Sequence, residues 1–319
     1  MLNLLKNEWM KIFKRAGTYV MIGLLLFFVT VMAAFIKYQE SGGTVPDNSD
    51  WQRGIEMQNE TLTKELEEYG DTFTPEMRHS YESDIAIGQY RLEHNISPND
   101  SYSVWSFVQD ASFVIEFVGM FSIIIAAGIV ASEFNWGTIK LLLIRPIRRE
   151  KILLSKYVTV VLFSLMLLAL LFSYSAILGG ILFGTPGEVS PYLRYQDGQV
   201  IETSMFVHLL TYYGLNSINL FMLTTMAFMI SAAFRNSSLA IGLSLFLMFM
   251  GGTVTSLVAM RYDWAKYILF ANTDLMQYLD GSPLIPGMTM GFSVIMLIIY
   301  FLLFQFIAFY TFKKRDVAA

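Results

Sequence analysis

One stretch of this chain, residues 133–156, concentrates the side chains best suited to recognition chemistry. It carries six basic residues against two acidic ones, and long apolar runs precede and follow it. A basic loop between apolar runs is typical of the cytoplasmic side of a membrane protein. The block at residues 141–144 is too apolar for a free loop and too short to cross a bilayer. A short helix across the membrane face therefore explains the stretch, with a solvated loop that only sets the topology as the alternative.

The order of residues in this stretch predicts a short helix lying across the membrane face. Thr138 can cap its start, because a threonine oxygen accepts a hydrogen bond from a free N–H group of the first turn. Residues 139–145 would form about two helical turns. Pro146 would end the helix, since proline lacks an N–H and clashes with the preceding turn. The next span then begins with a new helix.

The same residues resemble a known family. The pattern Glu-x-x-x-Gly-Thr, an apolar tract, Pro-x-x-Arg and a later Lys is similar to that of ABC-2-type transporter permeases. The resemblance extends along most of the chain and is weakest over residues 37–112. It implies a coupling helix between the second and third spans that docks on a separate ATPase subunit. The residues assigned to this coupling are Glu133, Gly137, Thr138, Leu142, Ile144, Pro146, Arg148, Arg149 and Lys156.

The resemblance also implies partners and a direction of transport. Two ATPase subunits would carry ATP and Mg, and a second permease subunit, identical or homologous, would complete the complex. The cargo would be a drug, an antimicrobial peptide or a lipid-like molecule that is exported across the bacterial plasma membrane. This chain would itself bind no cofactor and no nucleic acid.

The sequence contains no set of residues that indicates catalysis. It has no G-x-x-x-x-G-K-[ST] segment with which to bind ATP phosphates, so an ATP-driven process would need a second polypeptide. It has no cysteine, which excludes thiolate nucleophiles and cysteine metal sites. The three histidines lie outside any H-E-x-x-H pattern, and we therefore expect neither a metal site nor an enzyme.

The composition predicts an all-α, polytopic membrane protein. Hydrophobic residues make up 55% of the 319 positions, charged residues make up 15%, and the mean hydropathy is +0.50. Several apolar runs reach the roughly 20 residues that cross a bilayer as a helix. We expect an interfacial amphipathic helix at 1–16, because Leu2, Leu5, Trp9, Ile12 and Phe13 share one helical face. The expected spans are 17–36, 113–132, 157–183, 204–234, 239–258 and 288–312.

The segments between the spans divide into two classes. Residues 37–112 carry fifteen acidic and five basic side chains, and two helices, at about 51–69 and 75–94, predict a small extracellular hairpin. A solvated acidic linker is the alternative reading of that segment. Residues 184–203 are expected to be an outer loop, and 259–287 an outer segment with short helices. Residues 235–238 and 313–319 are expected to be an inner turn and a cytoplasmic tail.

The distribution of basic residues predicts which side is cytoplasmic. Fourteen of the 22 Lys and Arg residues fall on the two termini and on the two loops that share their side. The positive-inside rule counts basic residues on such short loops and tails, so both termini are expected to be cytoplasmic.

A few polar residues within the spans are candidates for a substrate path. Glu116 is the acidic residue placed within a span, where ionisable groups are costly and usually functional. Tyr212, Tyr213, Asn216 and Asn219 form a polar patch in the fourth span. Hydrogen bonding between membrane helices is the alternative role for that patch.

The function that the sequence favours is the membrane-spanning permease subunit of an ATP-driven exporter. The alternative is a membrane sensor or scaffold in an envelope-stress or peptide-resistance complex, with the acidic hairpin as its ligand-binding part. An intramembrane enzyme is a third class, and the sequence offers it no recognisable catalytic set.

Overall fold

The structure is a computed structural model that describes residues 1–42, 50–98, 102–138, 147–185, 191–196, 198–234, 236–279 and 283–314. Its helices are α1 (Leu2–Phe13), α2 (Ala16–Gly42), α3 (Trp51–Tyr69), α4 (Pro75–His94), α5 (Val104–Ala111), α6 (Ile115–Asn135), α8 (Arg149–Leu182), α9 (Met205–Ala233), α10 (Ser237–Ala259), α11 (Leu269–Asn272) and α12 (Met290–Lys314). Short 3-10 turns are η2 (Gly70–Thr72), η3 (Ser112–Val114), η4 (Asp263–Tyr267) and η5 (Met276–Tyr278), and β1 (Tyr192–Gln196) pairs with β2 (Gln199–Thr203).

Six helical segments among the described residues are long and apolar enough to cross a membrane. They are α2, the continuous run of α5, η3 and α6, and then α8, α9, α10 and α12. An α-helix pairs its backbone N–H and C=O groups within itself, which suits it to a hydrocarbon environment that offers no partners. The predicted all-α polytopic architecture is confirmed at this level.

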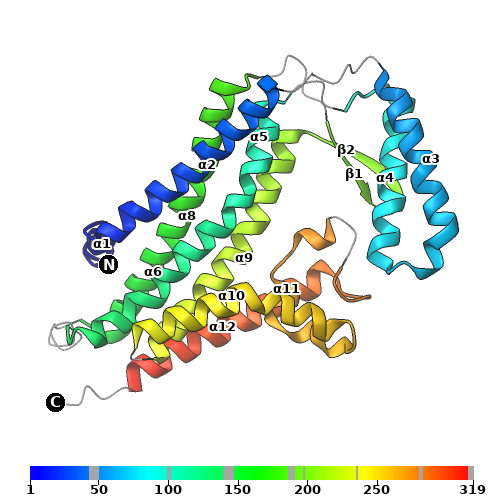
Figure 1. Ribbon diagram of the computed structural model, residues 1–319. Helices are drawn as coiled ribbons and strands as arrows, with labels where there is room; N and C mark the ends of the chain where they lie inside the picture. The colour runs from blue at the N-terminus through cyan, green and yellow to red at the C-terminus, as the bar shows by residue number, and fades with distance from the viewer. Residues whose placement is uncertain are drawn as a thin grey trace.

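Helix α6 forms the centre of the bundle and packs against α8, α9 and α10 (Figure 1). Its inner half is rich in small residues, and Ala126, Ala127 and Ala131 are fully buried. Small side chains let helix backbones approach closely, which strengthens packing between membrane helices. Helix α6 therefore joins α8, α9 and α10, while α12 packs mainly on α9 and α2 mainly on α8.

The outer faces of α2, α10 and α12 are apolar and exposed. They include Phe27, Phe246, Leu257, Ile295 and Phe306, each more than half exposed. A soluble monomer rarely exposes so large a contiguous apolar surface. These faces therefore suit contact with lipid tails or with another membrane helix.

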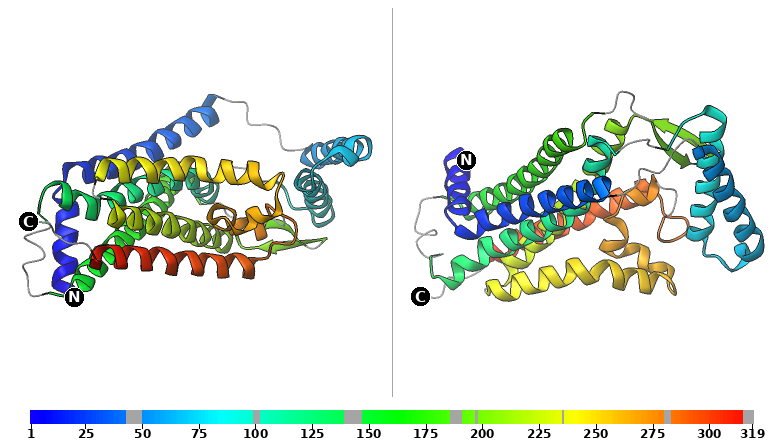
Figure 2. Two further views of the ribbon diagram at one scale, coloured as in Figure 1. Left: turned by 90° about the horizontal axis from the view of Figure 1, so that it is seen from below. Right: turned by 45° about the horizontal axis from the view of Figure 1, so that its top comes forward.

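The two ends of the bundle carry different structures. Helix α1 lies across one end, and the α3–α4 hairpin stands at the opposite end (Figures 1 and 2). Thr74 caps α4 by accepting a hydrogen bond from the N–H of Met77, and Pro75 occupies the first turn. Asn95, with φ of +52°, ends α4 in the left-handed conformation. The predicted helical hairpin is thus present, with the predicted bounds 51–69 and 75–94.

Residues 192–196 and 199–203 differ from the prediction of an outer loop. They form an antiparallel strand pair with Tyr192 opposite Thr203 and Gln196 opposite Gln199. Gly198 has φ of +79°, and the sequence Asp-Gly between two alternating segments is a strong signal for a tight hairpin. The pair packs on α4, and the hydroxyl of Tyr90 donates a hydrogen bond to Glu202 Oε1 at 3.3 Å. An otherwise helical protein therefore carries a small strand hairpin at this end.

The segment between α10 and α12 is held in place by polar contacts. Ser293 Oγ donates to Asn272 Oδ1 at 2.7 Å, and Asn272 Nδ2 donates to the carbonyls of Lys266 and Ile268. The amide of Gln277 donates to the carbonyl of Ala271. These buried side chains fix the short helices of the expected outer segment as a rigid cap on the ends of α10 and α12.

Close contact between α10 and this cap leads to the first testable prediction. A Cβ added at Gly251 would come within 2.3 Å of the Phe270 ring, whereas a Cβ at the neighbouring Gly252 would meet nothing within 4 Å. Overpacking of a contact costs about 1–3 kcal/mol. Gly251→Ala should therefore lower the thermal unfolding temperature in detergent, and the matched control Gly252→Ala should not. Equal unfolding temperatures for the two variants would contradict the contact.

Several predicted boundaries need correction. The second span was expected at 113–132, but its helix runs from Val104 to Asn135, because η3 continues the helical direction of α5. The coupling stretch was expected to reach residue 156, but α8 already begins at Arg149. Helix α2 reaches Gly42 and α12 reaches Lys314, beyond the predicted ends of the first and last spans. Polar residues extend these helices past the apolar runs that defined the predictions.

Candidate functional site

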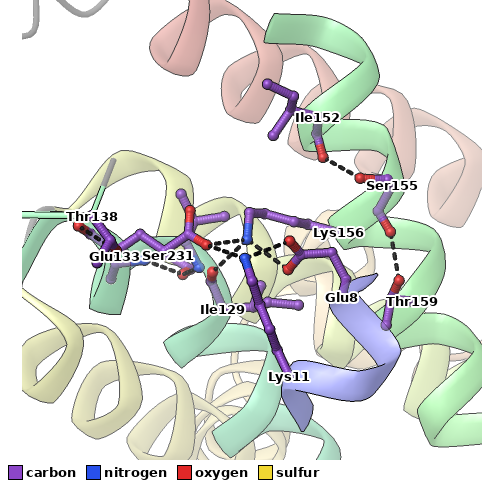
Figure 3. A network of polar contacts seen from close by, with 12 residues as sticks. Glu8, Lys11, Ile129, Glu133, Thr138, Ile152, Ser155, Lys156, Thr159 and Ser231 are labelled. Atoms are coloured by element: carbon purple, nitrogen blue, oxygen red, sulfur yellow. Dashed lines mark hydrogen bonds and ion pairs between the residues drawn. The ribbon is translucent and has the colours of Figure 1, made fainter. Parts of the chain in front are cut away.

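Four charged side chains from three helices meet at the end of the bundle where α1 lies (Figure 3). Lys156 Nζ, from α8, lies 2.7 Å from Glu8 Oε2 of α1 and 2.7 Å from Glu133 Oε1 of α6. Lys11 Nζ, one turn after Glu8 on α1, lies 2.8 Å from Glu8 Oε1 and 3.1 Å from Glu133 Oε1. We call Glu8, Lys11, Glu133 and Lys156 the ion cluster. It contains two positive and two negative charges and is therefore neutral as a unit.

The ion cluster lies mostly away from solvent. Lys156 is 0% exposed, and Glu8 and Glu133 are each 6% exposed. Charges removed from water lose several kcal/mol of solvation each, so they persist only when they are paired and hydrogen-bonded. Lys156 Nζ also donates to the carbonyl oxygen of Ile129 at 3.3 Å, which gives this ammonium a third acceptor. Glu8, Glu133 and Lys156 therefore depend on one another, whereas the Lys11 side chain remains 43% exposed.

Helix geometry explains why these side chains meet. Glu8 and Lys11 are three residues apart, and Ile129 and Glu133 are four apart, so each pair projects from one face of its helix. Glu133 lies in the last turn of α6, and Lys156 lies two turns after α8 begins. The cluster thus joins the end of α6 and the start of α8 to the helix that precedes the first span.

The pKa values of the two α1 members are shifted in opposite directions. Burial alone would raise the pKa of Glu8, but Lys156 and the hydrogen bonds from Lys11 and Lys156 lower it on balance. Burial alone would lower the pKa of Lys11, but the hydrogen bond to Glu8 and the charge of Glu133 raise it on balance.

These directions define the pH window in which the ion cluster is stabilising. A lowered carboxyl pKa adds stability that is lost only below the ordinary value of 4.5, and a raised amine pKa adds stability that is lost only above 10.5. Glu8 and Lys11 therefore keep their charges, and the stability that their pairing adds, throughout the neutral range.

Neighbouring contacts fix the helices around the ion cluster. Ser231 Oγ on α9 accepts hydrogen bonds from the backbone N–H groups of Val130 and Ala131 on α6. The guanidinium of Arg15 lies 5.3 Å from the centre of the Trp136 ring, a cation–π contact just beyond α6. Together they restrict the position of the α6 end relative to α9 and to the start of α2.

The remaining predicted coupling residues that the structure describes follow the end of α6 or begin α8. Gly137 has φ of +68°, which favours glycine, and it turns the chain away from α6. Thr138 Oγ1 donates to the Glu133 carbonyl at 3.4 Å instead of capping a helix by accepting a hydrogen bond. Arg148 is the N-cap residue of α8, and Arg149 Nη1 donates to the carbonyl of Lys313. Leu142, Ile144 and Pro146 lie outside the described residues, as does the predicted helix at 139–145.

A cavity of about 480 Å³ lies beside the ion cluster. Its lining includes Leu4, Lys11 and Arg15 from the N-terminal part and Trp136 and Ile152 from the ends of the two spans. Thr138 and Ile147, which flank residues 139–146, also line it. The cavity is thus bounded by both ends of the predicted coupling segment.

The predicted substrate-path residues do not form one group. Glu116 is exposed on the outside of α6 and shares no hydrogen bond with the fourth-span residues within the described part of the chain. Tyr213 is buried, and its hydroxyl donates to the carbonyl of Val108 at 3.1 Å. Asn216 donates to the carbonyl of Tyr212 in its own helix, and Asn219 is half-buried. For Tyr213, the observed contact is that of interhelical packing.

Sequence reasoning identified Glu133 and Lys156 but missed Glu8 and Lys11 as their partners. A signal was present, because Glu8 is the only acidic residue in a basic N-terminal helix. It also lies four residues before Ile12, which is 2% exposed, and therefore on the buried side of α1.

Among the residues that the structure describes, no three His, Asp or Glu side chains are grouped to hold a metal ion.

Comparison with known proteins places the chain in a family. The family model described as "Protein of unknown function (DUF2705)" matches residues 79–318, about three-quarters of the chain. The chain belongs to the DUF2705 family. The expected membership of the ABC-2-type permease family is therefore wrong, because the matching family is a different one with no described function.

The chain is also similar to two proteins from Bacillus subtilis (strain 168). The uncharacterized protein YhcI is 53% identical over 320 residues and is covered over its full length, as is this chain. The uncharacterized membrane protein YdbK is 34% identical over 198 residues, which are 61% of this chain and 76% of YdbK. The name of YdbK and the six apolar helices together identify a multi-pass membrane protein.

Proposed function

We propose that this DUF2705 protein is the membrane-spanning subunit of an ATP-driven exporter whose ATPase is a separate chain. The observation that carries the proposal is the ion cluster, which connects both ends of the basic segment 139–146 to α1. A partner that pushes on that segment would move α6 and α8 together, because Glu133 and Lys156 are joined by buried ion pairs. The central packing of α6 would spread this movement to α9 and α10.

A separate ATPase is required because the chain has no phosphate-binding loop. No G-x-x-x-x-G-K-[ST] segment occurs in the 319 residues. Basic side chains at the same end of the bundle, including Arg148 and Lys151, are exposed and available to a partner. We propose two ATPase copies with bound ATP and Mg, and a second permease subunit that covers part of the exposed apolar faces of α2, α10 and α12.

The proposed orientation places α1 and both termini in the cytoplasm and the α3–α4 hairpin outside the cell. Helix α1 would lie in the membrane interface, since Leu2 is 80% exposed while Glu8 and Ile12 are buried against the spans. The clustering of basic residues at the α1 end agrees with the positive-inside rule.

Cysteine labelling gives a direct prediction for this orientation. The chain contains no cysteine, and Glu67 on α3 and Arg148 before α8 are both exposed. In intact cells, a membrane-impermeant maleimide should label Glu67→Cys and leave Arg148→Cys unlabelled. Inside-out vesicles should give the opposite result, which controls for the reactivity of both sites. Labelling of Arg148→Cys alone in intact cells would contradict the orientation.

Transport measurements distinguish an exporter from the alternative, a membrane sensor or scaffold in an envelope-stress or peptide-resistance complex. Inside-out vesicles that contain this chain and its ATPase should accumulate an exported compound when ATP is added outside. Suitable compounds are a fluorescent cationic drug, a cationic peptide and a fluorescent lipid, one for each proposed class of cargo. A sensor would show binding or signalling without ATP-dependent accumulation of any of the three.

A further inference from the structure

A second cavity, of about 650 Å³, lies at the end of the bundle opposite α1. It is an open hollow lined by residues from the turn of the α3–α4 hairpin, the end of α10 and the cap that follows α10. We call it the outer cavity. Its volume falls in the range of sites that bind small molecules. Its lining includes Thr74, Gly252, Ser256, Phe270, Asp274 and Leu284.

One wall of the outer cavity is apolar and firmly held. Phe270 packs directly on Gly251, where even a Cβ atom would come within 2.3 Å of the ring. Gly252 and Ser256 continue this wall one residue and one turn further along α10. A Cβ added at Gly252 meets nothing within 4 Å, so the cavity is open above this residue.

The polar groups that line the outer cavity, from the cap and from α10, are mostly engaged within the protein. The amide nitrogen of Gln277 donates to the carbonyl of Ala271 at 3.1 Å, and its oxygen accepts from the N–H of Leu284 at 2.8 Å. Ser256 Oγ donates to the carbonyl of Gly252. These contacts stiffen the wall and leave few groups to select a polar ligand.

Asp274 is the one ionisable side chain among the described residues that line the outer cavity. It is exposed, and its Oδ1 accepts a hydrogen bond from the N–H of Met276 at 2.9 Å. This contact orients the carboxylate at the rim. A negative charge beside an apolar wall is complementary to a molecule with an apolar body and a positively charged end.

The hairpin beside the outer cavity adds to this preference. Residues 51–94 carry ten acidic and four basic side chains. Such a surface raises the local concentration of cations over a distance of about 8 Å at physiological ionic strength. The negative charge of Asp274 at the rim and the negative charge of the α3–α4 hairpin therefore both favour a cationic ligand.

We infer that the outer cavity binds a small amphipathic cation, with its apolar body against Phe270 and Gly252 and its ammonium group beside Asp274. This inference goes beyond the proposed exporter function, because binding at this end needs neither the ATPase nor ATP. If the outer cavity binds no such ligand, the proposed coupling to an ATPase can still be correct. If there is no ATPase partner, the cavity can still bind the ligand.

Binding of dansylcadaverine to the full chain in zwitterionic lipid nanodiscs tests the inference. This probe joins an apolar fluorophore to a primary amine, and its N-acetylated derivative is a neutral match. We expect the amine to bind about two- to fivefold more tightly than the acetylated compound, as for an ion pair at an exposed carboxylate. Asp274→Asn should remove that difference, because asparagine keeps an oxygen for Met276 but carries no charge. Asp263→Asn, a change at an exposed acidic residue that does not line the cavity, should keep it.

A bulky substitution tests the position of the apolar body. Gly252→Leu should abolish binding of both compounds by filling the outer cavity, and Gly242→Leu should leave binding unchanged. Gly242 is on the same helix, and a Cβ there also meets nothing within 4 Å. Equal binding of the charged and neutral compounds would overturn the inference and indicate an apolar hollow that bilayer lipid fills. Binding that survives Gly252→Leu would also overturn it.

Discussion

Replacement of Lys156 by methionine is expected to destabilise the folded protein by about 3–5 kcal/mol, because it leaves two carboxylates buried with one amine between them. Lys156 is fully buried and lies 2.7 Å from both Glu8 and Glu133. Methionine has a similar length and no charge, so packing changes little and the lost ion pairs dominate. Thermal unfolding of the purified protein measures this effect.

Two further variants show whether the ion cluster is the cause. Lys151→Met, at an exposed position on the same helix, should leave the unfolding temperature unchanged. Glu8→Gln and Glu133→Gln, added to Lys156→Met, should restore part of the lost stability, since the buried carboxylates are then neutral. A Lys156→Met protein as stable as the parent would contradict the buried ion cluster.

Leu142→Asp is expected to separate the protein from its proposed ATPase without preventing insertion. If residues 139–145 dock in a groove of the partner, the new carboxylate is buried there without a counter-ion. Such a change costs about 2–5 kcal/mol of binding free energy, or more than about thirtyfold in affinity. Quantitative co-purification measures the loss.

The control for Leu142→Asp introduces the same charge at a nearby exposed site. Asn135 ends α6, and its amide donates a hydrogen bond to Ser237 Oγ at 2.9 Å. An aspartate at this position would instead accept a hydrogen bond from the Ser237 hydroxyl, so the contact is kept. Asn135→Asp should therefore retain the partner. Equal retention by Leu142→Asp would show that this segment does not dock on the ATPase.

The spans could be predicted from the sequence because their apolar runs are long and local. The strand pair at 192–203 was missed although Asp197-Gly198 carries a hairpin signal, since the neighbouring membrane helices favoured a simple loop. Lys156 and Glu133 were identified on the resemblance, but Glu8 lies 148 residues from Lys156 in the sequence. The periodicity of apolar residues within one helix cannot predict a contact between side chains so far apart in the sequence. The predicted family was also wrong, since similar spacing of a few residues does not establish common descent.

If hydrolysis on a separate chain drives movement in this one, ATPase activity should purify with this protein. The full-length chain, tagged and solubilised from the membranes of the cells that produce it, should retain a phosphate-binding-loop protein and hydrolyse ATP. We expect the bound partner and the ATP hydrolysis with the parent protein and with Asn135→Asp, and neither with Leu142→Asp. A folded parent protein that purifies without any ATP-hydrolysing partner would show that this chain is not driven by a separate ATPase.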